Sequence, residues 1–273
     1  MRTQLNALRF SVRNALGFRR GPPTLLQEPK TELFDYLERG AAKRAEARER
    51  ELRKRYALEP LSACSTRFDY RDNVYLLDAL ETIIGGETFA ARVPGEALRI
   101  VDVGSKNFNY AFALERFFRN RAGPRSEVAL LGVELDGHVV YRDWRARCDY
   151  AEAYVRQTEN PRVAYRVADF CSIEGDSFDV ATLLFPFVTR HALVRWGLPT
   201  RFFEPKRLFA KAIECTPKGS LLVLSQTESE RDVLLETVAT LGVDVAASVP
   251  IPSRLVHYHD ALTERFGTLL RVV

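Results

Sequence analysis

Three acidic side chains accompany three successive apolar segments of this chain. The pairs of apolar segment and acid are Leu98–Val103 with Asp102, Val128–Val133 with Glu134, and Val163–Ala168 with Asp169. Carboxylates accept hydrogen bonds from amino and hydroxyl groups, and Glu134 can accept two from a ribose. One such acid alone is explained by helix capping. Three acids at the ends of three strands are not required by packing, so together they indicate a site for a nucleotide-like ligand.

The first acid belongs to the stretch Val101-Asp102-Val103-Gly104-Ser105-Lys106-Asn107, which is typical of a strand that ends in a tight turn before a helix. A glycine there lets the backbone approach a ligand, and Asp102 can hold an amino group or orient the loop. Open α/β sheets bind ligands beyond the carboxyl ends of their strands. We therefore expect Gly104, Ser105 and Lys106 to join the three acids in one site.

This order of features resembles the class I S-adenosylmethionine-dependent methyltransferases. In that family the first strand ends in a D/E-x-G-x-G-x-G loop, the second in an acid that binds the ribose, and the third in an acid beside an apolar residue that holds adenine. The matching residues are Asp102 with Gly104, then Glu134, then Asp169 with Phe170. The likeness covers roughly residues 98–273. It implies S-adenosyl-L-methionine as cofactor and methyl transfer to an acceptor that the sequence does not identify, a small molecule or another kind.

Two positions depart from the family pattern. Lys106 and Phe108 replace the second and third glycines of the loop. Either the Lys106 ammonium pairs with the carboxylate of the cofactor's methionine end, or the pocket is altered. After the fourth strand the chain has Leu184-Phe185-Pro186-Phe187, where enzymes that methylate amino groups often carry D/N-P-P-Y/F. The polar residue that would receive the amine's hydrogens is absent, which counts against that acceptor class.

The chain has four histidines, and one of them is our candidate for a catalytic base. His191 follows the fourth strand on a loop expected to face the site, and imidazole titrates near neutrality. A lone histidine is more often structural, so that alternative stays open. His257 and His259 are two residues apart, yet no third ligand accompanies them. We expect no metal site.

Composition limits the class of protein. The formal net charge of +4 is small for 273 residues, so no strong nucleic-acid signal is present. The four cysteines are far apart, which favours reduced thiols and a cytoplasmic protein over a disulfide scaffold. The longest apolar run, residues 180–188, is well short of the ~20 residues that a membrane helix needs. We expect a soluble protein.

The N-terminal residues 1–27 contain five arginines and no acid, and Leu5, Leu8, Val12 and Leu16 are spaced for one helical face. A basic amphipathic helix can lie on an anionic membrane or dock on an acidic partner. The alternative, a tail that covers the edge of the core, is favoured. Gly21-Pro22-Pro23 then interrupts the helical pattern. We expect three parts: a basic tail at 1–27, a helical extension or cap at 28–96, and an α/β domain at 97–273.

Apolar runs and helical periodicities alternate along the rest of the chain. Continuous apolar strands are typical of a parallel sheet covered on both faces, so we expect an α/β fold with a doubly wound, mostly parallel sheet. The methyltransferase resemblance implies seven strands, the last inserted antiparallel. The predicted helices are 31–55, 72–84, 110–119, 141–157, 203–215 and 228–241, and the predicted strands are 98–103, 128–134, 163–168, 178–184, 220–225, 243–249 and 266–272.

Two other functions fit parts of the sequence. A non-catalytic binding module could keep the fold, lose the glycine loop and use the basic extension to contact a partner or a membrane. A nicotinamide-dependent oxidoreductase would also use an α/β sheet. The second is disfavoured because no G-x-G-x-x-G follows the first strand, so a pyrophosphate would lack its usual binding loop.

Overall fold

The centre of the protein is one seven-stranded sheet, seen in a computed structural model that describes residues 2–123, 126–256 and 264–273. The strand order is β3-β2-β1-β4-β5-β7-β6. The strands are β1 Leu98–Val103, β2 Val128–Glu134, β3 Val163–Val167, β4 Val180–Leu184, β5 Ser220–Ser225, β6 Val243–Ile251 and β7 Arg265–Val272. Strands β1 to β5 are parallel, whereas β7 is antiparallel to both β5 and β6. The predicted fold class is confirmed.

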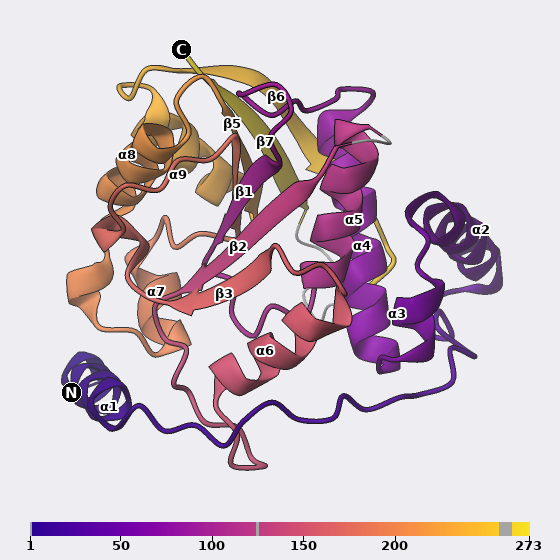
Figure 1. Cartoon of the computed structure of the whole chain (residues 1–273), viewed down its shortest axis with the longest axis horizontal. Coiled ribbons are helices and arrows are strands. Elements are labelled where there is room, and N and C mark those ends of the chain that lie inside the picture. The colour runs from indigo at the N-terminus through magenta and orange to yellow at the C-terminus, as the bar shows by residue number, and fades with distance from the viewer. Residues whose placement is uncertain (1, 124–125, 257–263) are drawn as a thin grey trace.

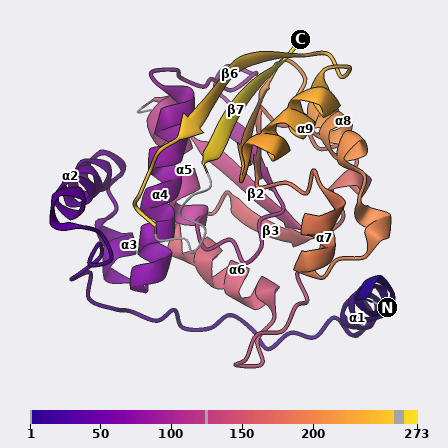
Figure 2. The ribbon, with the colours of Figure 1, turned by 180° about the vertical axis from the view of Figure 1, so that it is seen from behind.

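Helices cover both faces of this sheet (Figures 1 and 2). One layer contains α2 Arg39–Tyr56, α3 Glu59–Ala63, α4 Arg67–Ile84, α5 Ala111–Ala122 and α6 Arg147–Gln157, and the other contains α8 Pro205–Cys215 and α9 Glu228–Val238. Helix α4 contacts β6 and β7, α5 contacts β2, and α9 contacts β5 and β7. At the carboxyl edge lie α1 Arg2–Leu16, α7 Arg190–Trp196 and the short 3-10 helices η1 Phe170–Ser172 and η2 Thr200–Phe202. Among the described residues, no helix has the length and apolar content to cross a membrane.

The apolar runs of the strands become two separate cores because successive side chains point to opposite faces. In β1, Leu98 and Ile100 pack with α4 and α5, whereas Val101 packs with the layer that contains α8 and α9. A strand buried on both faces must be apolar at consecutive positions, which explains the unalternating sequence. Among the helices of residues 28–96, α4 packs on one face of the sheet, and α2 packs on α4 and α5. The division into three parts stays a prediction.

Several predicted helices begin elsewhere in the structure. The helix predicted from Thr31 begins at Arg39, after a run of turns, and its N-cap is Glu38. Helix α4 begins five residues earlier than predicted because Thr66 caps it, accepting a hydrogen bond from the Asp69 backbone N–H at 3.0 Å. The sequence predicts a helix over residues 141–157, which would include residues 141–146. They instead form a loop closed by an isolated bridge between Val140 and Ala146.

Phe108 fills a space that Gly132 leaves open in β2. The Phe108 side chain is fully buried, and a Cβ added at Gly132 would lie 2.8 Å from its ring. Contacts that close do not occur for real side chains, so the two positions are complementary in size. The pairing fixes the start of α5 against the sheet directly behind the candidate site.

We expect Gly132→Ala to lower the free energy of unfolding by about 1–3 kcal/mol, because the added methyl group overpacks the contact with Phe108. Phe108→Leu should relieve this clash. The double variant should therefore be more stable than the sum of the two single effects predicts, which urea unfolding of the four proteins measures. Additive effects would contradict the contact.

Candidate functional site

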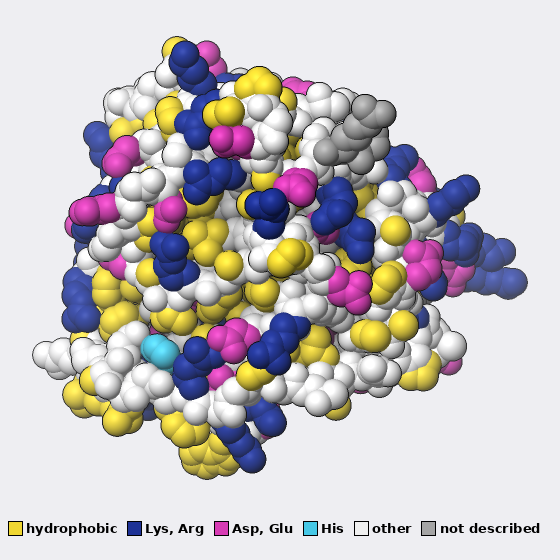
Figure 3. All heavy atoms as spheres, viewed as in Figure 1, with side chains coloured by type: hydrophobic (Ala, Val, Ile, Leu, Met, Phe, Trp, Pro, Cys, Tyr) yellow, Lys and Arg dark blue, Asp and Glu magenta, His cyan; other side chains and the backbone are white. Residues whose placement is uncertain are grey.

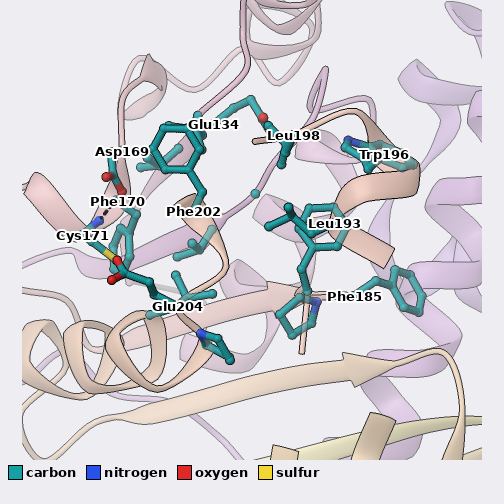
Figure 4. A pocket seen from close by; sticks show the side chains of 18 of the residues that line it. Glu134, Asp169, Phe170, Cys171, Phe185, Leu193, Trp196, Leu198, Phe202 and Glu204 are labelled. Atoms are coloured by element: carbon teal, nitrogen blue, oxygen red, sulfur yellow. Dashed lines mark hydrogen bonds between the residues drawn. The ribbon is translucent and has the colours of Figure 1, made fainter. Parts of the chain in front are cut away.

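A cavity opens at the carboxyl edge of the sheet, where residues following five parallel strands meet. Its polar side is formed by Gly104 and Lys106 after β1, Glu134 at the end of β2, and Asp169 and Phe170 after β3. Residues that follow β4 and β5 form the rest. Figure 4 shows Glu134, Asp169 and Phe170 on one side of the cavity, with Leu193 and Trp196 across from them. Five of the predicted site residues are thus brought together.

The Glu134 carboxylate is buried and accepts hydrogen bonds from three protein groups. Its Oε2 accepts from the Lys106 backbone N–H at 2.9 Å, and its Oε1 accepts from the Asp136 backbone N–H at 2.8 Å. Arg147 Nη1 also donates to Oε1, at 3.2 Å. Two carboxylate oxygens have about four acceptor positions in total, so one remains for a ligand. Glu134 therefore both shapes the site and faces it.

The loop after β1 keeps a glycine-like backbone although two of its expected glycines are missing. Gly104, Lys106 and Phe108 all have positive φ angles, of 81°, 50° and 57°. A left-handed conformation costs a residue other than glycine about 1 kcal/mol. Contacts hold the strained residues in place: Glu134 binds the Lys106 N–H, and the Tyr165 hydroxyl donates to the Lys106 carbonyl at 2.6 Å. The sequence departure therefore changes the side chains and preserves the loop.

The Lys106 side chain lines the cavity. The sequence leaves open whether its ammonium pairs with the carboxylate of the cofactor or the pocket is altered. Its ammonium lies 4.9 Å from the centre of the Trp196 ring, a distance suited to a cation–π contact. Burial lowers the pKa of Lys106, and the charges of Asp72 and Glu134 oppose that shift. A partly desolvated ammonium attracts an anion more strongly than a fully hydrated one does.

Asp102 does not line the cavity. Its carboxylate is fully buried and accepts hydrogen bonds from the Thr182 hydroxyl at 2.6 Å and the Tyr110 hydroxyl at 2.8 Å. Ser105, which is also buried, donates to the Asp102 backbone carbonyl at 2.8 Å. Of the two roles considered for this acid, these contacts fit the orientation of the loop. Burial raises the pKa of Asp102 to about 6, although both hydroxyls stabilise its charge.

Asp169 and Phe170 begin the 3-10 helix that follows β3. Asp169 Oδ1 accepts from the Cys171 backbone N–H at 2.9 Å, the contact drawn in Figure 4. Its other oxygen has no hydrogen bond among the described residues, and Asp169 is one of the residues that line the cavity. Phe170 is buried beside it. A free carboxylate oxygen next to an aromatic face can bind a flat, apolar ring that carries an amino group.

The predicted catalytic base lies outside this arrangement. His191 is exposed in the first turn of α7 and is absent from the cavity wall. The sequence predicts a loop up to His191, but residues 190–196 form helix α7. This helix directs Leu193, and not His191, toward the cavity. His257 and His259 lie outside the described residues.

Sequence reasoning missed the apolar side of the cavity. Phe187, Leu193, Trp196, Leu198 and Phe202 line it from the segment between β4 and α8. The available signal was the concentration of aromatic residues in a segment without strand character. Phe185, where this segment begins, has a φ of 61° and is another strained residue at the site.

No protein-family model and no curated protein sequence matches the chain. Solved structures do match its fold. A geranyl diphosphate C-methyltransferase from Streptomyces coelicolor A3(2) aligns with 77% of this chain and 85% of its own, with 12% identity and a TM-score of 0.49. A SAM-dependent methyltransferase from Aquifex aeolicus aligns with 65% of this chain and 84% of its own, with 13% identity and a TM-score of 0.46.

TrmN from Thermus thermophilus aligns with 74% of this chain, with 13% identity and a TM-score of 0.47. The alignment covers 49% of TrmN, so this chain spans about half of TrmN's length. Likenesses with TM-scores below 0.5 carry no argument about this chain, so its fold is described from its own strands. The strand order and the antiparallel β7 of this chain are those that its sequence resemblance implied. The chain has the seven-stranded, doubly wound α/β fold that its sequence predicts.

We expect Asp102→Asn to remove a pH dependence of stability. Because the folded pKa of Asp102 is about 6 and the ordinary value is 3.8, the folded protein binds more protons than the unfolded chain between these values. The free energy of unfolding therefore falls as pH rises through this window, by about 3 kcal/mol, and is level above it.

Urea unfolding from pH 4 to 7 checks this as the difference between wild type and Asp102→Asn, with the exposed Asp244→Asn as the control for the substitution itself. A difference that is constant over this range, or that grows with pH, would show that Asp102 is not held in this environment.

Proposed function

We propose that this protein binds S-adenosylmethionine in the cavity at the carboxyl edge and transfers its methyl group to an acceptor. The observation that carries the proposal is the pair of carboxylates, Glu134 and Asp169, that end adjacent parallel strands and line one cavity together with Phe170. An adenosyl group offers ribose hydroxyls and an amino-bearing ring. Both suit acceptor-only side chains.

The donors and acceptors of the cavity fit such a ligand. Glu134 has one acceptor position left for a ribose hydroxyl, and Asp169 has a free oxygen for the adenine amino group. At Gly104 nothing lies within 4 Å of an added Cβ, so the backbone is open to the ligand. We assign the Lys106 ammonium to the carboxylate of the methionine end, because it is the lysine of the cavity wall.

When bound, the cofactor supplies an electrophilic methyl group. The chain's own residues hold the reactants in line and exclude water, which is the main requirement for such a displacement. Cys171, also on the wall, does not compete as a nucleophile at neutral pH because burial raises the pKa of its thiol to about 11. His191 is exposed and outside the wall, so we no longer assign it the role of base.

The apolar side of the cavity indicates the class of acceptor. Side chains such as Phe187, Leu193 and Phe202 offer no hydrogen bonds to a polar group and would bury an apolar one. We therefore propose an acceptor with an apolar body, whose reacting atom points toward the polar side. A free amine acceptor fits poorly, since Leu184 stands where a polar residue would be needed.

We expect the purified protein to bind S-adenosylhomocysteine, and Glu134→Ala to weaken binding by about 10–100-fold because a charge-assisted hydrogen bond to the ribose is lost. Isothermal titration calorimetry measures both affinities. Glu134→Gln keeps the side-chain volume and tests whether any loss follows the charge. The exposed Glu46→Ala on α2 is the matched control and should bind like the wild type.

No saturable binding of either S-adenosylmethionine or S-adenosylhomocysteine to folded wild-type protein would contradict the proposal, and binding of a reduced nicotinamide instead would favour an oxidoreductase. Cofactor binding without methyl transfer to any apolar acceptor would favour the non-catalytic binding module.

We further expect the cavity to distinguish adenine from hypoxanthine through Asp169. Wild-type protein should bind S-adenosylhomocysteine about tenfold or more tightly than S-inosylhomocysteine, whose ring has a carbonyl in place of the amino group. Asp169→Asn retains an oxygen for the Cys171 N–H and adds an amide donor. Its preference should shift toward the inosine compound. Equal wild-type affinities for the two compounds would refute this role of Asp169.

A further inference from the structure

Helix α1 is fixed to the rest of the protein through one of its faces. The Asn6 side-chain amide donates to the Val194 carbonyl at 3.0 Å, and the buried Phe10 ring lies 5.0 Å from that of Phe202. Arg13 forms two hydrogen bonds with the carboxylate of Asp136, at 2.6 and 3.2 Å. These contacts satisfy the polar groups of that face. The orientation of α1 is therefore set by interactions within the chain.

The opposite side of α1 exposes the apolar stripe that the sequence predicted. Leu5, Leu8, Val12 and Leu16, at positions i, i+3, i+7 and i+11, are exposed by 42%, 63%, 47% and 73%. Helix α1 covers the edge of the core through Phe10, as the favoured expectation has it, while these four side chains face away from the core. Figure 3 shows hydrophobic side chains gathered at the lower left, over α1. A stripe of this kind on a helix that is already anchored indicates an external partner.

An exposed aromatic loop continues this surface. Trp144, 70% exposed, has a φ of 62° in the loop between β2 and α6, and Phe18 is 43% exposed just after α1. The Arg20 guanidinium donates to the Asp143 carbonyl at 3.1 Å, so this loop lies beside the N-terminal segment. Tryptophan is enriched at membrane–water interfaces, and a strained, exposed one is not explained by packing.

The charge of this segment is opposite to that of an anionic lipid surface. The whole chain carries a formal charge of +4 and residues 1–27 carry +5, so the remaining residues together carry −1. Arg13 and Arg19 pair with acids of the chain, whereas Arg9 on α1 and Arg20 just after it are exposed. An apolar face flanked by arginines, on a helix that does not span, is the pattern of helices that lie in the membrane interface.

We propose that the surface formed by Leu5, Leu8, Val12, Leu16, Phe18 and Trp144 docks this protein on an anionic lipid bilayer. The stripe enters the headgroup region, while the exposed Arg9 and Arg20 bind lipid phosphates. A convex helix face can lie against a flat bilayer. An acidic peptide would instead need a groove to hold it. Docking does not depend on the proposed methyl transfer. Because Phe10 of α1 contacts Phe202 of the cavity wall, docking would place the bilayer, as a source of an apolar acceptor, close to the cavity.

Flotation of the full chain with vesicles tests the proposal. The protein should bind vesicles of phosphatidylcholine with phosphatidylglycerol, should bind pure phosphatidylcholine at least about tenfold more weakly, and should dissociate as salt is raised. Leu8→Glu with Leu16→Glu should reduce binding by about tenfold or more. Phe68→Glu, on α4 at the opposite end of the molecule in Figures 1 and 2, removes a similarly exposed apolar side chain and should bind like the wild type.

A fluorescence measurement supplies a second readout, because the chain has two tryptophans, Trp144 and Trp196. In Trp196→Phe the emission of Trp144 should shift to the blue on anionic vesicles. Absence of binding, equal binding to neutral vesicles, or no shift of Trp144 would overturn the proposal. Sedimentation velocity gives a further test. A wild-type dimer that the double variant Leu8→Glu with Leu16→Glu dissociates would also overturn the proposal, because a second copy would then cover the stripe.

Discussion

The Glu134 carboxylate is the interaction on which the candidate site depends. It binds N–H groups of Lys106 and Asp136 and the guanidinium of Arg147, which belong to the β1 loop, the β2 loop and α6. Hydrogen bonds to a buried charge contribute about 1.5–3 kcal/mol each, and removing the acceptor would leave all three donors without a partner. Asp136 in turn binds Arg13 of α1. The same carboxylate therefore links the strained loop, the cavity wall and the N-terminal helix.

The β1 loop shows how a fold can keep a conformation whose sequence signature is incomplete. Lys106 and Phe108 occupy left-handed positions that glycine would occupy without strain. Burial of the Phe108 ring against Gly132 and the contact of the Lys106 N–H with Glu134 offset this strain. In exchange, the cavity gains an ammonium that a glycine could not supply.

Much of the fold could be predicted because its cause is local. Consecutive apolar residues predict strands buried on both faces, and the acids at their ends predict the edge at which the cavity lies. The position of Asp102 could not be predicted, since its partner Thr182 is 80 residues away on β4. The exposure of Leu8 and Leu16 also could not be predicted. Helical periodicity locates an apolar face but does not determine whether the protein core or an external partner covers it. Trp196 and Phe202 were missed because their common role depends on how α7 and η2 pack together.

The central claim is that Glu134 and Asp169 together bind an adenosyl group. A crystal structure of the protein grown with saturating S-adenosylhomocysteine tests it most directly. The account predicts a ribose hydroxyl against Glu134, the adenine amino group against the free oxygen of Asp169, and the amino-acid carboxylate near Lys106. A nucleoside bound elsewhere, or a cavity that stays free of ligand in well-ordered crystals, would contradict it.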